Sequence, residues 1–136
     1  MTPPAPLPAG DALFPAGWAV LRGLEILGGD WRAALAGRPR GAAVPDWAME
    51  RMVAYFLFRH FLKAVNDGDL LGRVQLAVFG SLAVAGAAGT LGIPEALRIY
   101  CREIEHSEEN IAALLVEFAQ NPALSLPAFF KTLENW

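Results

Sequence analysis

The chain has 136 residues, a length that suits one domain with a real hydrophobic core. Hydrophobic residues make up 54% and charged residues only 18%, so either the core is large for the length or apolar surface meets a partner or a membrane. The net charge of −3 and the lack of a basic stripe give no reason to expect nucleic acid. One cysteine, Cys101, excludes an intramolecular disulfide and a cysteine-only metal site, and it fits a reducing cytoplasm.

The first 44 residues are rich in Pro and Gly and are expected to form a loosely attached N-terminal arm with one or two short helices. Met1–Gly10 holds four prolines, which favour an extended or disordered chain, and it lacks the basic and long apolar segments of a secretory signal. Helical spacing from Trp18 onward predicts a helix within Asp11–Leu27. A short helix is expected over Trp31–Ala36, with Asp30 as its N-terminal cap.

Residues 45–136 are expected to form the main helical domain, whose first helix is predicted over Asp46–Asn66. Asp46 would cap this helix, and Asp67-Gly68 would end it. The helix is apolar nearly all round, which is typical of a helix buried in the middle of a bundle. Its two apolar stripes are Met49, Met52, Val53, Phe56 and His60 on one side, and Ala54, Phe58, Phe61, Leu62 and Val65 on the other.

The next helix is predicted over Leu70–Leu91, with Asp69 as its cap. Val74–Ile93 is uncharged over 20 residues, a length that could cross a bilayer. The run has no belt of Trp or Tyr at its ends and contains many small residues. We therefore favour a packed central helix that neighbouring helices approach closely, with a small membrane-embedded protein as the alternative.

Three further helical segments complete the pattern. Pro94 opens one helix, which is expected to kink or break near His106-Ser107, where Ser107 caps the next. Ile111–Phe118 shows the clearest amphipathic spacing in the chain, and Ser125 is expected to cap a last helix. Because no strand-like alternation persists, the predicted fold class is all-α. We expect a compact bundle or orthogonal array of about five helices, with the Pro-rich N-terminal arm beside it.

The most polar run of the chain is Arg102–Asn110, which contains one of its two histidines. Glu103 and His106 form a Glu-x-x-His pair on one helix face, a spacing that binds two metal ions in some four-helix bundles. Such a site needs a second copy of the motif. The other histidine, His60, has Leu57 three residues before it, so we expect no metal.

We expect instead a polar cluster that fixes the register of the helices. Arg59 and Arg73 are the expected partners of Glu103 or Glu105. His60 is expected to make one core hydrogen bond. The sequence assigns no catalytic residue and no cofactor-binding residue. The candidate cluster comprises Arg59, His60, Arg73, Arg102, Glu103, Glu105 and His106.

Two runs carry a resemblance to a known family. Phe58–Arg73 reads FRHFLKAVNDGDLLGR, and Ile99–Asn110 reads IYCREIEHSEEN. With the residues around them, from Ala48 to Leu115, they resemble the C-terminal part of the flagellin lysine-N-methylase family. Cys101 stands where a serine would be expected before Arg102 in that family.

The resemblance implies bacterial relatives that transfer a methyl group from S-adenosylmethionine to lysines of flagellin. Those relatives are larger, and a cysteine cluster upstream is thought to hold an iron–sulfur centre. This chain has one cysteine only. The resemblance therefore implies kinship with the helical C-terminal module of the family, and it transfers no catalytic residue to any position here.

Three hypotheses about function follow. The first is a non-catalytic, cytoplasmic helical module that acts in protein–protein interaction, with a methylase, flagellin or a second copy of itself as partner and with no cofactor. The second is a protein-lysine N-methyltransferase, in which case S-adenosylmethionine would be the cofactor. The third is the membrane-embedded protein, and we favour the first.

Overall fold

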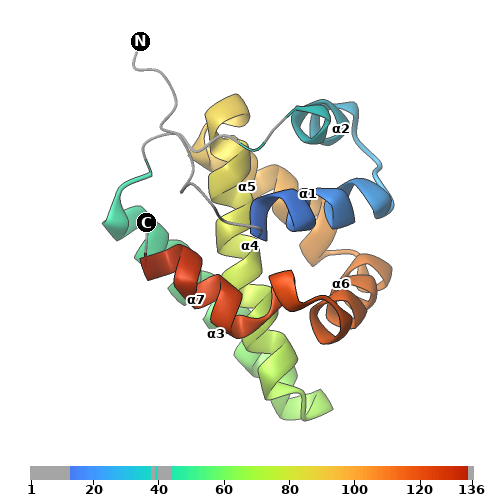
Figure 1. Ribbon diagram of the computed structural model, residues 1–136, viewed down its shortest axis with the longest axis vertical. Coiled ribbons are helices and arrows are strands. Elements are labelled where there is room, and N and C mark those ends of the chain that lie inside the picture. Colours follow the sequence, from blue (N-terminus) through green and yellow to red (C-terminus); the bar gives the residue numbers. More distant parts are fainter. Residues whose placement is uncertain (1–12, 38, 40–43, 135–136) are drawn as a thin grey trace.

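A computed structural model describes residues 13–37, 39 and 44–134, and within them it is all-helical without strands, which confirms the predicted fold class. Helices α3 to α7 correspond to the five expected in the main domain, and α1 and α2 to the two short helices expected before it (Figure 1). The elements are α1 (Leu13–Gly23), α2 (Gly29–Ala36), α3 (Asp46–Asp67), α4 (Leu70–Leu91), α5 (Ile93–Tyr100), the π-helix η1 (Cys101–Glu105), α6 (Glu108–Gln120), the 3₁₀ turn η2 (Pro122–Leu124) and α7 (Leu126–Glu134).

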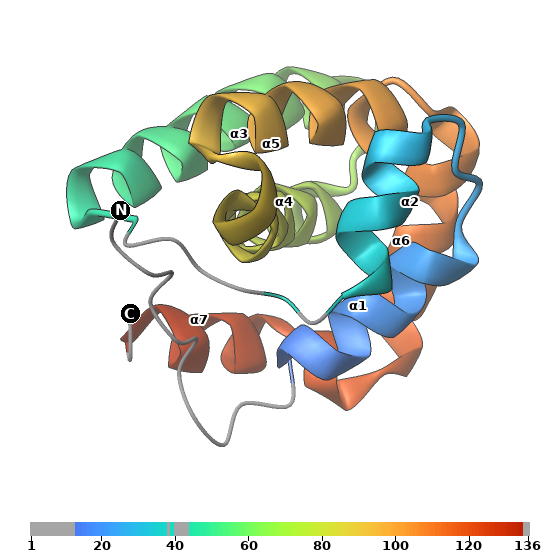
Figure 2. The same ribbon diagram turned by 90° about the horizontal axis from the view of Figure 1, so that it is seen from above.

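Helix α4 lies at the centre of the molecule. Figure 2 shows it end on, with α3 and α5 along one side, α1, α2 and α6 along another and α7 along a third, and it contacts each of these helices. Its glycines let neighbours approach closely. A Cβ atom on Gly80 would lie 3.2 Å from the ring of Tyr100, and one on Gly86 would lie 2.9 Å from the ring of Trp18. The packed central helix expected from the sequence is therefore α4.

Helix α4 is also the one described helix that is long and apolar enough to cross a membrane. In its most apolar window 72% of the residues are buried inside the protein, as in the core helix of a soluble protein. Its only charged residue is Arg73, near its first turn, and its one fully buried hydroxyl is satisfied within the helix: Ser81 Oγ donates to Ala77 O at 2.9 Å. An uncharged helix of this kind is stable in water only when other helices cover it.

Local signals place most of the helix ends. Gly68 ends α3 in the left-handed conformation with φ of 72°, and Asp69 accepts a hydrogen bond from Gly72 N at 2.9 Å at the start of α4. Ser107 caps α6 by accepting from Asn110 N at 3.2 Å. Asp30 and Asp46 are not the caps that we expected. Both lie inside the first turn of their helices, where a carboxylate still faces the positive end of the helix dipole.

The loose attachment expected for the N-terminal arm is wrong for α1 and α2. Both helices bury aromatic and aliphatic side chains in the common core, with Trp18, Leu21 and Trp31 at most 2% exposed. Arg22 joins the two helices, because its guanidinium donates to Leu35 O at 2.5 Å and to Gly37 O at 2.9 Å. The proline-rich stretch, residues 1–10, lies outside the described residues.

The position expected for α3 in the middle of the bundle is also wrong. Its first stripe packs inward, with Met49, Met52 and Phe56 at most 5% exposed. Its second stripe faces solvent, with Phe58 71% and Val65 72% exposed. Among the described elements α3 packs mainly along α4, at the edge of the molecule (Figure 2). The excess of apolar residues noted in the sequence therefore lies partly on the surface of this helix.

Candidate functional site

The polar run of the sequence forms η1, a single π-helical turn between α5 and α6. His106 N donates to Cys101 O at 3.1 Å, a bond that spans five residues instead of four. The wider turn carries two carboxylates that are both buried, since Glu103 is 1% and Glu105 5% exposed. π-Helical turns are frequent at functional sites. Each of these carboxylates therefore needs a partner, and they find partners on different elements.

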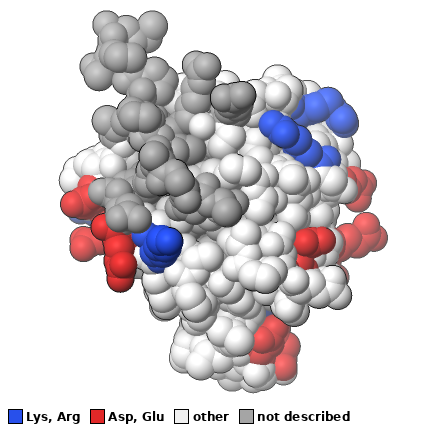
Figure 3. Space-filling view, viewed as in Figure 1, with Lys and Arg blue, Asp and Glu red and all other residues white. Residues whose placement is uncertain are grey.

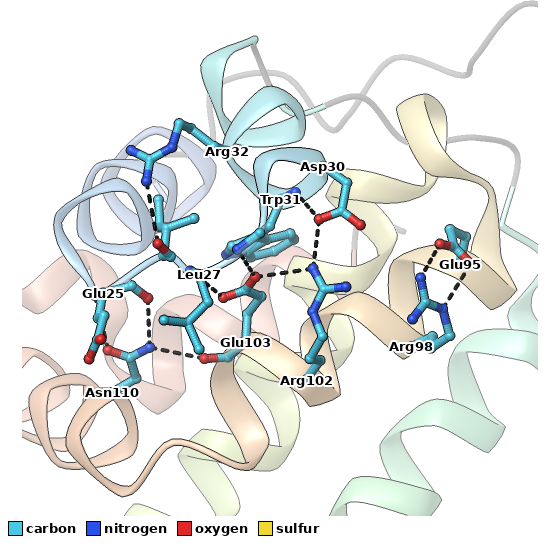
Figure 4. Close-up of polar contacts among 12 residues, drawn as sticks. Glu25, Leu27, Asp30, Trp31, Arg32, Glu95, Arg98, Arg102, Glu103 and Asn110 are labelled. Carbon is cyan, nitrogen blue, oxygen red and sulfur yellow. Dashed lines mark hydrogen bonds and ion pairs between the residues drawn. The ribbon is translucent and has the colours of Figure 1, made fainter.

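Glu103 binds the backbone of the α1–α2 loop (Figure 4). Its Oε2 atom accepts from Leu27 N at 3.0 Å and its Oε1 atom from Gly28 N at 2.7 Å. Arg102 bridges the two segments, because its guanidinium donates to Glu103 at 3.1 Å and to Asp30 at 2.6 Å. The hydrogen bond from Arg102 lowers the pKa of Asp30. Glu103 thus anchors the N-terminal helices to η1, and the bonds it makes are structural.

Asn110 completes this anchor, and sequence reasoning missed it. Its side chain accepts from Glu25 N at 3.2 Å and donates to Glu25 O at 3.0 Å and to Glu103 O at 2.9 Å. The residue is 4% exposed. The sequence does contain a sign that Asn110 is buried, because Asn110, Leu114 and Phe118 recur every fourth residue along the buried stripe of α6.

Glu105 points the other way, towards α3. Its Oε1 atom lies 2.9 Å from His60 Nε2, and both side chains are 1% exposed. Arg59 Nε lies 3.7 Å from the second oxygen of Glu105. The pKa of Arg59 is raised chiefly by its hydrogen bond to Tyr55, with a smaller contribution from Glu105. The expected pairing of Arg59 with a carboxylate of the polar run and the expected core hydrogen bond of His60 are both confirmed.

Two of the seven candidate residues lie outside these clusters. Arg73 was expected to pair with Glu103 or Glu105. It binds Asp67 instead, with Nη2 2.5 Å and Nε 3.0 Å from Asp67 Oδ2, because the tight turn at Gly68 brings the two side chains together. His106 is exposed at the end of η1. The single cluster predicted is therefore two clusters, Arg102–Glu103 and Arg59–His60–Glu105, on different sides of η1.

Within the described part of the chain no group of three His, Cys, Asp or Glu side chains is placed to hold a metal ion. Burial raises the pKa of the Cys101 thiol and the charge of Glu105 raises it further, so the thiol stays protonated at neutral pH. Burial likewise raises the pKa of Tyr100 well above its usual value. Tyr100 belongs to the core, and Cys101 packs against it.

The exposed apolar side of α3 is the other notable feature. Next to it is a hollow of about 320 Å³, lined by Leu57, Phe58, His60, Phe61, Leu70, Arg73 and Val74. Sparse charge is general in this molecule: Figure 3 shows a face on which charged side chains form separate groups around a broad uncharged area. On α3, however, large side chains also project, with Phe58, Leu62 and Val65 each more than half exposed.

Comparisons with family models, with curated proteins and with solved structures found no match for this chain.

Replacing Glu103 by Ala should destabilise the protein by roughly 2–4 kcal/mol, because the amides of Leu27 and Gly28 lose a charged acceptor in a buried place. Urea unfolding measures this loss. Hydrogen exchange of the two amides should become faster. The control is Glu50→Ala on the exposed surface of α3, which should change stability by less than about 0.5 kcal/mol. Equal effects of the two substitutions would refute the anchoring role.

Because His60 and Glu105 are bonded to each other, we expect substitutions of the two residues to have non-additive effects on stability. His60→Leu and Glu105→Leu each leave a buried polar partner unpaired, so each should cost roughly 3–5 kcal/mol. The double variant replaces both groups by apolar side chains and should be more stable than either single variant. Urea unfolding of the four proteins closes the cycle. A double variant that loses the sum of the two single effects would show that the pair does not act as a unit.

Proposed function

We propose that the chain is a non-catalytic helical module that acts in protein–protein interaction. Its contact surface would be the outer α3 face, which we define as Trp47, Ala54, Phe58, Phe61, Leu62 and Val65, together with Leu70 at the start of α4. The large side chains in this set are between 56% and 72% exposed. With ordinary side-chain areas they present on the order of 700 Å², more than the largest apolar patch of a typical monomer.

This exposure is the observation that carries the proposal. A soluble protein that leaves three large aromatic side chains on one helix in water loses solubility unless something covers them. Aromatic residues are also the side chains that most often dominate binding energy at interfaces. The face contains Trp47, Phe58 and Phe61, and α3 is held from the inside by Phe56 and His60, so it is a firm platform.

Kinship with the C-terminal module of flagellin lysine-N-methylases is part of the proposal and rests on the two runs quoted above. One contact supports reading them as a unit: His60 lies in the first run, Glu105 in the second, and their side chains are hydrogen-bonded in the core. The partner classes that the resemblance adds are a methylase chain and flagellin. A cytoplasmic location belongs to the same proposal.

No specific contact favours the methyltransferase alternative. Glu103 and Glu105 are the buried carboxylates of the polar run, and both are engaged in structural hydrogen bonds. We therefore retain the interaction module alone as the proposed function.

A photo-reactive amino acid at Phe58 tests the proposal in the cells that make the protein. It should capture a protein partner several-fold more efficiently than the same probe at Leu27, which is 76% exposed but lies outside the outer α3 face. Any protein counts as a partner here, including a second copy of the chain. Capture at Phe58 no greater than at Leu27 would overturn the proposal.

A further inference from the structure

The outer α3 face has the spacing of a helix-pairing seam. One line along this face, with Arg51 added, advances by alternating steps of four and three residues. We call it the seam, and it consists of Trp47, Arg51, Ala54, Phe58, Phe61 and Val65. This alternation averages 3.5 residues, the repeat that keeps one side of a helix against a second helix. The inward stripe of α3 already packs on α4, so α3 carries a second seam that no described element covers. The spacing indicates a helix as the occupant of this seam.

We propose that the occupant is α3 of a second copy of this chain, paired antiparallel about a two-fold axis that crosses the outer seam at the level of Phe56. This inference rests on the proposed function, because it names the partner of the same face. A two-fold axis makes each contact occur twice, and it closes the assembly at two copies.

Side-chain sizes favour this register. With the axis at the level of Phe56, Ala54 of one copy lies opposite Phe58 of the other, and Trp47 lies opposite Val65. Alternation of large and small side chains across a seam lets the layers interdigitate. A parallel pair would instead place Phe58 opposite Phe58 and Ala54 opposite Ala54, which leaves one layer crowded and the other empty.

Charge favours the same arrangement. Arg51 is the one charged side chain in the seam, and its guanidinium already lies 5.3 Å from the ring centre of Trp47. In the antiparallel pair Arg51 meets the ring of Phe61 of the second copy, a favourable cation–π contact. In a parallel pair the two Arg51 side chains would oppose each other, with like charges in an apolar seam. The sequence of the seam therefore disfavours the parallel alternative.

The available area suits a dimer. The outer α3 face presents on the order of 700 Å² on each copy, close to the roughly 800 Å² that each partner contributes to a standard stable interface. The interface would be mainly apolar with aromatic residues at its centre, as homodimer interfaces are.

Sedimentation or light scattering of the purified chain measures its mass in solution. We expect twice 14.6 kDa at micromolar concentration. Phe58→Glu should give a folded monomer, because this side chain is 71% exposed and does not support the core. Val116→Glu, at an exposed apolar side chain on another helix, α6, is the matched control and should stay dimeric. Circular dichroism confirms that both variants are folded. A wild-type monomer under these conditions would overturn the inference.

Cysteine crosslinking tests the register independently. In a Cys101→Ser background, Trp47→Cys and Val65→Cys chains should form a disulfide only when mixed, because each position lies opposite the other in the pair. Eighteen residues separate the two positions, so like positions of the two copies would be about 27 Å apart, too far for a disulfide. Crosslinking of either variant with itself would overturn the antiparallel register.

The mass measurement and the photo-capture at Phe58 together separate this inference from the function it rests on. If the chain is a monomer and the Phe58 probe captures a different protein, the second copy is not the occupant. The proposed function as an interaction module would still stand. A dimer that persists in Phe58→Glu would sink the inference as well, because the copies would then meet through another surface. Absence of any capture at Phe58 would remove both.

Discussion

The fold depends on covering α4 on all sides. This helix carries no charge after Arg73, and fourteen of its residues are buried, so it is stable only inside a shell of other helices. Its small residues make the shell possible, because Gly80 lies against Tyr100 and Gly86 against Trp18 at distances that a larger side chain would not allow. The packing of α1, α5 and α7 against α4 follows from that requirement.

The polar run serves this architecture. The π-helical turn η1 carries Glu103 towards the α1–α2 loop and Glu105 towards His60 on α3. Buried carboxylates with well-placed partners specify which elements meet more strongly than they add stability. The most polar segment of the sequence therefore holds the N-terminal helices and α3 in register around α4.

Most helix ends could be predicted from the sequence, whereas the packing of the helices could not. Gly68, Asp69 and Ser107 set helix ends through bonds within three or four residues, so the sequence was enough to locate them. Whether a helix is central or peripheral depends on what packs against it, and α3 is more peripheral than its composition suggested. The partner of Arg73 was missed although it is local, because the turn at Gly68 folds Asp67 back against Arg73. Apolar spacing alone does not say which of two stripes faces inward.

The outer α3 face is where this account makes its central claim, that α3 meets a second copy of the chain. Hydrogen–deuterium exchange at increasing protein concentration tests it most directly. The account predicts that amides of α3 exchange more slowly as concentration rises through the dimerisation range, while those of the α1–α2 loop, which open locally and lie outside the seam, stay unchanged. Exchange of α3 that is the same at every concentration would contradict it.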